Sequence, residues 1–233
     1  MSRVIGVNVI SDGLIFYLDA ANGKCYPKSG VNVNDLKSNI GGTLENGVGY
    51  NADDLGSFDF DGIDDYIDCT NDPIFDFGIT DAFSIETWVK FNDLTGPRFI
   101  VSKWVRPTLP DLRAYTMTTN VNKLTLRIFS SNTSAIIVES DPILSTGVWY
   151  HLVVTYDGSV SANGVNLYIN NSISNNIIRS DLSGVISNTV PLQIGGQDTF
   201  FTDGQIANVK IYNRELSQNE VDQNYNALKY RFI

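Results

Sequence analysis

The chain has 233 residues, 42% of them hydrophobic and 11% aromatic, a composition that is typical of a folded globular protein and excludes a disordered chain. Its net charge of −10 at pH 7 argues against nucleic-acid partners and against anionic membranes, because an acidic surface repels phosphates. No apolar run is long enough to insert across a membrane, and the first residues lack the apolar core and cleavage site of a signal peptide.

Short stretches of alternating polarity, separated by turns, begin at residue 14. Residues 14–19 (LIFYLD) form the first predicted strand, whereas residues 20–54 are rich in Gly, Asn, Ser and Asp and are predicted to be mostly loop. The next predicted strands are 64–69 (DDYIDC), 83–91 (FSIETWVKF) and 123–129 (KLTLRIF). In the last two, apolar and polar residues alternate, so each strand is expected to bury one face.

The second half of the chain continues the same pattern. Residues 148–156 (VWYHLVVTY) are apolar on both faces and are predicted to form a central strand. Strands at 164–170, 190–196 and 205–213 follow. Turns and not helices connect these segments, which predicts an all-β chain folded as an antiparallel sandwich or barrel.

One short helix is predicted near the C-terminus. Ser217 and Glu220 have the spacing of a capping box, and Val221, Tyr225 and Leu228 form a helical apolar stripe. We expect this helix to close over one end or edge of the sandwich.

We assign residues 13–233 to one domain, since β-sandwiches of this length usually fold as a unit. Residues 1–12 are either an edge strand or loose terminus of that domain, or an arm that pairs with a partner's sheet edge. Cys25 and Cys69 are too few for a disulfide framework and are expected to be unpaired and partly buried.

Several motifs follow one another along the chain: SFDFDGIDDYIDC, FSIETWVKF, VWYHLVVTYDG with VNLYIN, and LQIGG with DGQIANVKIYNRELSQNEV. They resemble the motifs of laminin G-like domains and occur in the order found in that family. The resemblance covers residues 13–229 and implies a two-sheet antiparallel jelly roll of the concanavalin A-like type. The opening stretch LIFYLDAANGKCYPKSGVNVNDL also resembles the start of laminin G-like domains in tailed-phage virion proteins.

No catalytic set is visible, so we do not expect an enzyme. Glycosidases of this superfamily place acids on alternate residues of one strand, whereas Glu86 stands alone and Glu139 is followed by Asp141 and a proline. The single histidine, His151, shares a strand face with Trp149 and is expected to be packed and to donate to a backbone group.

Two kinds of binding site are candidates. Five aspartates crowd into residues 59–68, and they either cap local turns or offer the oxygen ligands that Ca²⁺ prefers. The family resemblance implies calcium at a rim of the domain, with Asp19 and Asp64 as the metal ligands to test first, although no carboxylate occupies the family's closing-strand position within residues 204–208. A glycan site would use aromatic side chains in loops, and the candidates are Trp104, Tyr115, Asn132, Phe200, Phe201 and Asp203.

These observations lead to a functional hypothesis. We expect a non-enzymatic virion structural, decoration or fibre-associated protein of a tailed phage, assembled in the host cytoplasm and displaying a module that binds host glycans. Its partner would be a capsid or tail protein, contacted through residues 1–12; a homo-oligomer is left open. The alternative is a carbohydrate-binding or adhesion module of a cellular surface protein.

Overall fold

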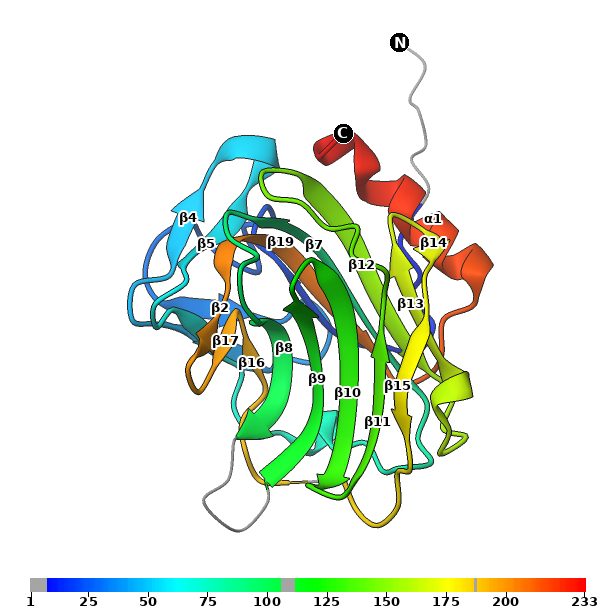
Figure 1. The fold of residues 1–233 in the computed structure, drawn as a ribbon. Coiled ribbons are helices and arrows are strands. Elements are labelled where there is room, and N and C mark those ends of the chain that lie inside the picture. Colours follow the sequence, from blue (N-terminus) through cyan, green and yellow to red (C-terminus); the bar gives the residue numbers. More distant parts are fainter. Residues whose placement is uncertain (1–7, 106–111, 187) are drawn as a thin grey trace.

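A computed structural model describes residues 8–105, 112–186 and 188–233 (Figure 1). Two large antiparallel sheets stack face to face as a sandwich, and a single α-helix follows the last strand. The predicted fold class is therefore confirmed. Among the described residues, no helix has the length and hydropathy needed to span a membrane.

The first sheet has eight strands. β19 is long enough to pair with β5 along its first half and with β1 along its second half. In spatial order the strands are β14 (Ser172–Ile173), β13 (Val165–Ile169), β12 (Trp149–Tyr156), β7 (Phe83–Phe91), β19 (Asp203–Tyr212), β5 (Ser57–Asp61) and β4 (Gly49–Asn51), with β1 (Leu14–Asp19) beside β19.

The second sheet has nine strands and faces the viewer in Figure 1. In spatial order these are β15 (Asn176–Ser180), β11 (Ser134–Glu139), β10 (Lys123–Ser131), β9 (Leu112–Asn120), β8 (Arg98–Val105), β16 (Gln193–Ile194), β6 (Tyr66–Asp68), β3 (Gly41–Glu45) and β2 (Asn32–Asn34). The remaining elements are a hairpin of β17 (Gly196–Gln197) and β18 (Phe200–Phe201), the helix α1 (Gln218–Leu228) and the 3₁₀ turns η1 (Asp53–Leu55), η2 (Pro73–Phe75), η3 (Ala162–Gly164) and η4 (Lys229–Arg231).

One hydrophobic core fills the space between the sheets, and alternation decides which residues enter it. Ile85 of β7 and Leu126 of β10 point inward from opposite sheets, whereas Glu86 and Arg127 point outward. β12 is buried along its whole length between β13 and β7, as its apolar faces predicted. Cys25 and Cys69 are free thiols, both fully buried in this core.

Helix α1 begins as predicted, because the Glu220 carboxylate accepts hydrogen bonds from the amide and the hydroxyl of Ser217, each at 2.9 Å. Its position was not predicted. The helix lies on the outer face of the eight-stranded sheet and not over an end, because that face carries apolar side chains. Val221 packs against Val153 of β12, and Tyr225 stacks on Trp88 of β7.

Residues 8–12 lie against α1 and the end of β19. Ile10 accepts a hydrogen bond from the Tyr212 hydroxyl and donates to the Asn224 side chain at 2.7 Å, and Gln223 donates to the carbonyl of Asn8. This part of the predicted N-terminal arm therefore contacts its own chain and is not a strand. Residues 1–7 lie outside the described residues.

Candidate functional site

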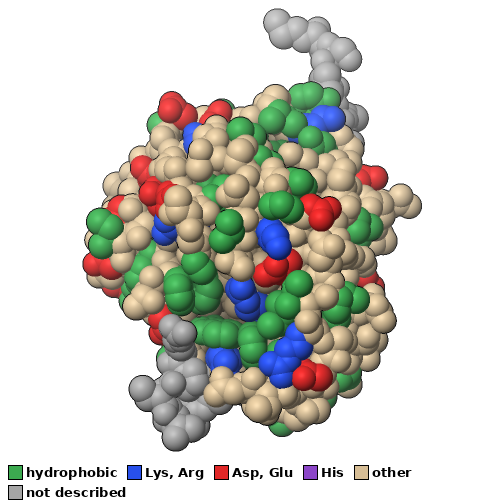
Figure 2. Space-filling view, in the orientation of Figure 1, with side chains coloured by type: hydrophobic (Ala, Val, Ile, Leu, Met, Phe, Trp, Pro, Cys, Tyr) green, Lys and Arg blue, Asp and Glu red, His purple; other side chains and the backbone are tan. Residues whose placement is uncertain are grey.

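Aromatic side chains gather on the outer face of the nine-stranded sheet, away from the main core. Figure 2 shows hydrophobic and basic side chains together on this face. They border a surface hollow of about 190 Å³. The lining residues are Pro97, Phe99 and Trp104 from β8 and the turn before it, Arg127 and Phe129 from β10, and Phe200 from β18.

The rings support one another across strands. Trp104 meets Phe129 edge-on with ring centroids 4.9 Å apart, and Phe200 of the β17–β18 hairpin lies 5.3 Å from Phe99. Phe200 is half-buried, whereas the other three rings are almost fully buried. The hollow is therefore a largely apolar surface with a partly exposed aromatic side chain at its border.

Two arginines add positive charge to this surface. The Arg113 guanidinium lies 5.3 Å from the centroid of the Trp104 ring and 4.9 Å from that of Phe129, distances typical of cation–π contacts. Arg113 also donates to the side chain of Asn132 at 2.5 Å. Arg127 donates from Nη1 to Oγ1 of Thr118 at 2.6 Å. A hollow of this kind suits a ligand with apolar faces and polar or anionic groups.

The predicted glycan residues do not form one site, and Asn132 lies in the turn between β10 and β11. Trp104 and Phe200 line the hollow. Phe201 points to the other side of the extended β18, where its ring packs on Gly196. The prediction that these residues lie in loops is wrong for all but Asn132, since the other five belong to strands. Tyr115 is also fully buried, and its hydroxyl donates to the carbonyl of Phe75. Asp203 lies in a separate acidic pocket.

Sequence reasoning missed four residues of the hollow: Pro97, Phe99, Arg127 and Phe129. A signal for Phe129 existed, because it shares the alternation of Lys123, Thr125 and Arg127 and is thus an aromatic residue on the polar face of its strand. Phe99 carried no comparable signal, since bulges in β8 shift its alternation.

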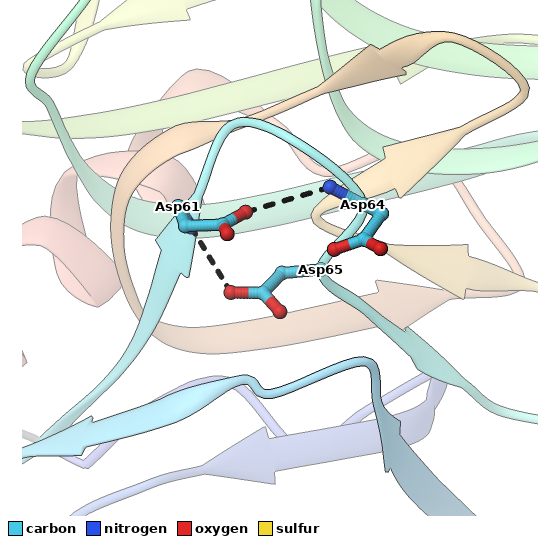
Figure 3. A group of neighbouring side chains, drawn as sticks. All are labelled: Asp61, Asp64 and Asp65. Atoms are coloured by element: carbon cyan, nitrogen blue, oxygen red, sulfur yellow. Dashed lines mark hydrogen bonds between the residues drawn. The ribbon is translucent and has the colours of Figure 1, made fainter.

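Three aspartates come together at the turn between β5 and β6 (Figure 3). Oxygen atoms of Asp61, Asp64 and Asp65 all lie within 4.8 Å of one another. The turn depends on Gly62, which has a φ of +75° and where a Cβ atom would lie 2.7 Å from that of Asp203. Asp61 caps this turn by accepting hydrogen bonds from the amides of Ile63 and Asp64.

Asp65 is the unusual member of this acidic cluster. Its side chain is only 3% exposed; Oδ2 accepts from the amide of Asp61, but Oδ1 has no hydrogen-bond partner among the described residues. Burial and the neighbouring carboxylates raise the pKa of Asp65. A pocket of about 260 Å³ adjoins it and is also lined by Asp59, Asn92 and Asp203. An unpartnered buried carboxylate oxygen among other oxygens fits a hard cation.

Asp19 is not part of that cluster. Its carboxylate accepts two hydrogen bonds from Nη1 of Arg231, at 3.1 and 3.2 Å, and one from the Tyr17 hydroxyl. The structure thus separates the two expected metal ligands, and it places Asp61 and Asp65 beside Asp64.

The acidic residues considered as catalytic groups, Glu86 and Glu139, both form ion pairs within the protein. Glu86 is fully buried under α1, with Oε1 2.6 Å from Nζ of Lys210 and 3.1 Å from Nε2 of His151. The expectation that His151 donates to a backbone group is wrong, because neither ring nitrogen has a hydrogen-bond partner among the described residues. Glu139 pairs with Lys123 at 3.2 Å.

Residues 61–222 match the profile of a family described as the concanavalin A-like lectin/glucanases superfamily. A comparison with curated proteins found no match.

Solved structures with a similar fold include toxin domains and an enzyme. The binding domain of Paraclostridial mosquitocidal protein 1 has a TM-score of 0.68 and 18% identity, covering 92% of this chain and 52% of that chain. The receptor-binding domain of botulinum neurotoxin C/D mosaic serotype has a TM-score of 0.69 and 19% identity, and the match covers 93% of this chain and 51% of that chain. Trypanosoma rangeli sialidase has a TM-score of 0.66 and 13% identity, and the match covers 98% of this chain and 36% of that chain. The chain thus spans about half of each toxin domain and about a third of the sialidase, and at these identities the likeness shows the fold alone.

Proposed function

The chain belongs to the concanavalin A-like lectin/glucanases superfamily, and from this premise we propose that it is a non-enzymatic domain that binds carbohydrate in the aromatic hollow of its nine-stranded sheet. The observation that carries the proposal is the hollow itself. The partly exposed ring of Phe200 at its border suits stacking on a sugar, and Arg127 in its lining offers donors for hydroxyl and acidic groups. Apolar walls with a few placed polar groups are typical of small-molecule sites.

A glycan array probed with the full chain tests this proposal. We expect binding to at least one glycan, and Phe200→Ala should weaken it about tenfold by removing the stacking surface. Tyr230→Ala is the matched control, because Tyr230 is an aromatic residue that is 83% exposed and lies beyond α1. Equal loss in both variants, or no glycan bound by the wild type, would contradict the proposal.

The non-enzymatic assignment is supported by the state of the carboxylates. Glu86 is sealed under α1 and held by Lys210, so it has no access to a substrate. Glu139 is tied to Lys123 and Asn120. Turnover of a glycoside panel by the purified chain that is abolished by Glu139→Gln would overturn this assignment.

We also propose that the acidic cluster of Asp61, Asp64 and Asp65 holds Ca²⁺. The support is the orphaned Oδ1 of Asp65 beside two further carboxylates. A bound cation would supply the positive charge that these carboxylates lack and would fix the turn between β5 and β6. Titration calorimetry with calcium tests the site directly, and absence of heat at millimolar calcium would count against it.

For the biological setting, we propose the surface of a tailed-phage virion, with a capsid or tail protein as the partner. The resemblance of the opening segment supports it, and an acidic surface favours solubility at high copy number. Cross-linking mass spectrometry on purified particles is the test, with cross-links from residues 1–12 to a capsid or tail protein expected. Recovery only from cell-surface fractions would favour the alternative, an adhesion module of a cellular surface protein.

A further inference from the structure

Arg127 lines the aromatic hollow from β10, an interior strand of the nine-stranded sheet. β10 lies between β9 and β11, and Arg127 faces outward there, two residues before Phe129. Its side chain is half-buried, and its Nη1 atom donates to Oγ1 of Thr118. The guanidinium is thus held in place by a neighbouring strand while it borders the open space.

The charge of Arg127 is not matched by an acid. Within the part of the chain that the structure describes, no carboxylate forms an ion pair with it, and Glu139, whose charge acts on it, is paired with Lys123. Other cations of the same sheet do have acidic partners, namely Arg98 with Asp93 and Arg179 with Asp181.

An unmatched, partly desolvated guanidinium is costly to maintain. Burial lowers the pKa of Arg127 below its usual value, and Glu139 offsets this only in part. The guanidinium has five N–H donors in a planar fork. One of them forms the hydrogen bond to Thr118. An anionic group on a ligand would supply the missing partner.

We infer that the hollow, taken as the glycan site proposed above, selects sugars that carry a carboxylate, and that Arg127 is the residue that binds this group. A planar carboxylate matches the guanidinium fork with two parallel hydrogen bonds. The adjoining rings of Trp104 and Phe200 would contact the apolar face of the same sugar.

Size and charge narrow the ligand further. The volume of about 190 Å³ is below the roughly 300–1,000 Å³ of drug-sized sites, so the hollow fits one sugar ring and not an extended chain. The net charge of −10 opposes densely charged polyanions at long range. A single carboxylated residue, either a uronic acid or a nonulosonic acid, agrees with both constraints.

Calorimetric titration of the full chain with acid and ester pairs tests the inference. The probes are trigalacturonate and 3′-sialyllactose, each compared with its methyl ester, which removes the charge and leaves the ring unchanged. We expect the wild type to bind one of the two acids about tenfold or more tightly than its ester. Which acid shows the preference identifies the class of sugar.

Two variants connect that preference to Arg127. Arg127→Gln should abolish the preference for the acid, so that the acid and its ester bind with the same affinity. Arg179→Gln removes the same charge from β15, outside the hollow, and should retain the tenfold preference.

The outcomes separate this inference from the proposed function. Equal binding of acid and ester by the wild type, with loss in Phe200→Ala, would overturn the inference and leave the carbohydrate site standing. Equal weakening of acid and ester in Arg127→Gln would assign Arg127 a structural role and also overturn it. If no probe binds and the glycan array shows no binding, both this inference and the proposed carbohydrate site would be overturned.

Discussion

Glu86 shows how a charged residue can be stable in the interior of this protein. Its carboxylate contacts Lys210 of β19, His151 of β12 and Asn224 of α1, and all four residues are fully buried. Burial opposes ionisation, but Lys210 and His151 outweigh it and lower the pKa of Glu86 to about 2. The cluster links two neighbouring strands and the helix to the strand that carries Glu86.

This pKa shift predicts the direction of the acid response. The unfolded carboxyl has a pKa near 4.5, so the folded state is stabilised by the ionised group above that pH, and the contribution is lost as pH falls from 4.5 towards 2. Urea unfolding at a series of pH values should show this loss for the wild type. The loss should be smaller in Glu86→Gln, and an identical pH profile in that variant would contradict the assignment.

Removal of the partner charge should be more damaging than removal of the pair. Lys210→Met leaves the Glu86 carboxylate buried without its main counter-charge, and we expect the free energy of unfolding to fall by about 3–5 kcal/mol. Adding Glu86→Leu should restore most of that loss. Lys123→Met, in the more exposed pair with Glu139, is the control and should cost less than about 1 kcal/mol.

Asp65 is the opposite case, a buried carboxylate without a counter-charge. Without calcium, Asp65→Asn should raise the melting temperature by about 2–4 °C, because the amide keeps the bond to the Asp61 backbone and removes a buried charge. The same change should abolish stabilisation by calcium in a thermal-shift titration. Asp68→Asn, outside the cluster, is expected to leave the calcium response intact.

At the scale of elements, α1 is anchored by one polar residue within its apolar stripe. The Asn224 side chain donates to Glu86 and to the Tyr212 hydroxyl, and accepts from the amide of Ile10. It therefore joins the helix to two strands and to the N-terminal segment.

Asn224→Ala should lower the free energy of unfolding by roughly 2–3 kcal/mol, since it removes a bond to a buried charge and leaves the amide of Ile10 without its partner. Asn226→Ala, at an exposed helix position that bonds only locally to the carbonyl of Asp222, should change stability by less than about 0.5 kcal/mol. Urea denaturation of both variants makes the comparison; similar losses would show that Asn224 does not anchor the helix.

At the scale of the whole molecule, the outer faces of the two sheets differ in how far their aromatic side chains are covered. Trp88 and Trp149 lie on the outer face of the eight-stranded sheet, against Tyr225 of α1 and Phe232, whereas Trp104 borders the open hollow of the other sheet. A single core joins both sheets. The helix and the C-terminal residues therefore cover tryptophans of the eight-stranded sheet, whereas the hollow on the nine-stranded sheet is open to a ligand.

Because one core serves both sheets, unfolding should be a single cooperative transition. Circular dichroism and tryptophan fluorescence should give coincident denaturation curves, since the tryptophans lie on both outer faces. Two separated transitions would show that the sheets, or the sandwich and its helix, unfold independently.

The sequence by itself determined the fold class, the central position of β12 and the start of α1. These features depend on local signals: alternation decides which face of a strand is buried, and the helix start depends on the spacing of Ser217 and Glu220.

Only the tertiary structure decided which outward-facing residues come together. Glu86 and Arg127 both occupy polar positions in alternating strands, yet one is sealed beneath a helix and the other borders an open hollow. Asp19 and Asp64 both looked like metal ligands, but Arg231, more than 200 residues away in the chain, engages Asp19. Strand period fixes the face of a residue, whereas its neighbours there come from strands and loops distant in sequence, and no local pattern encodes them.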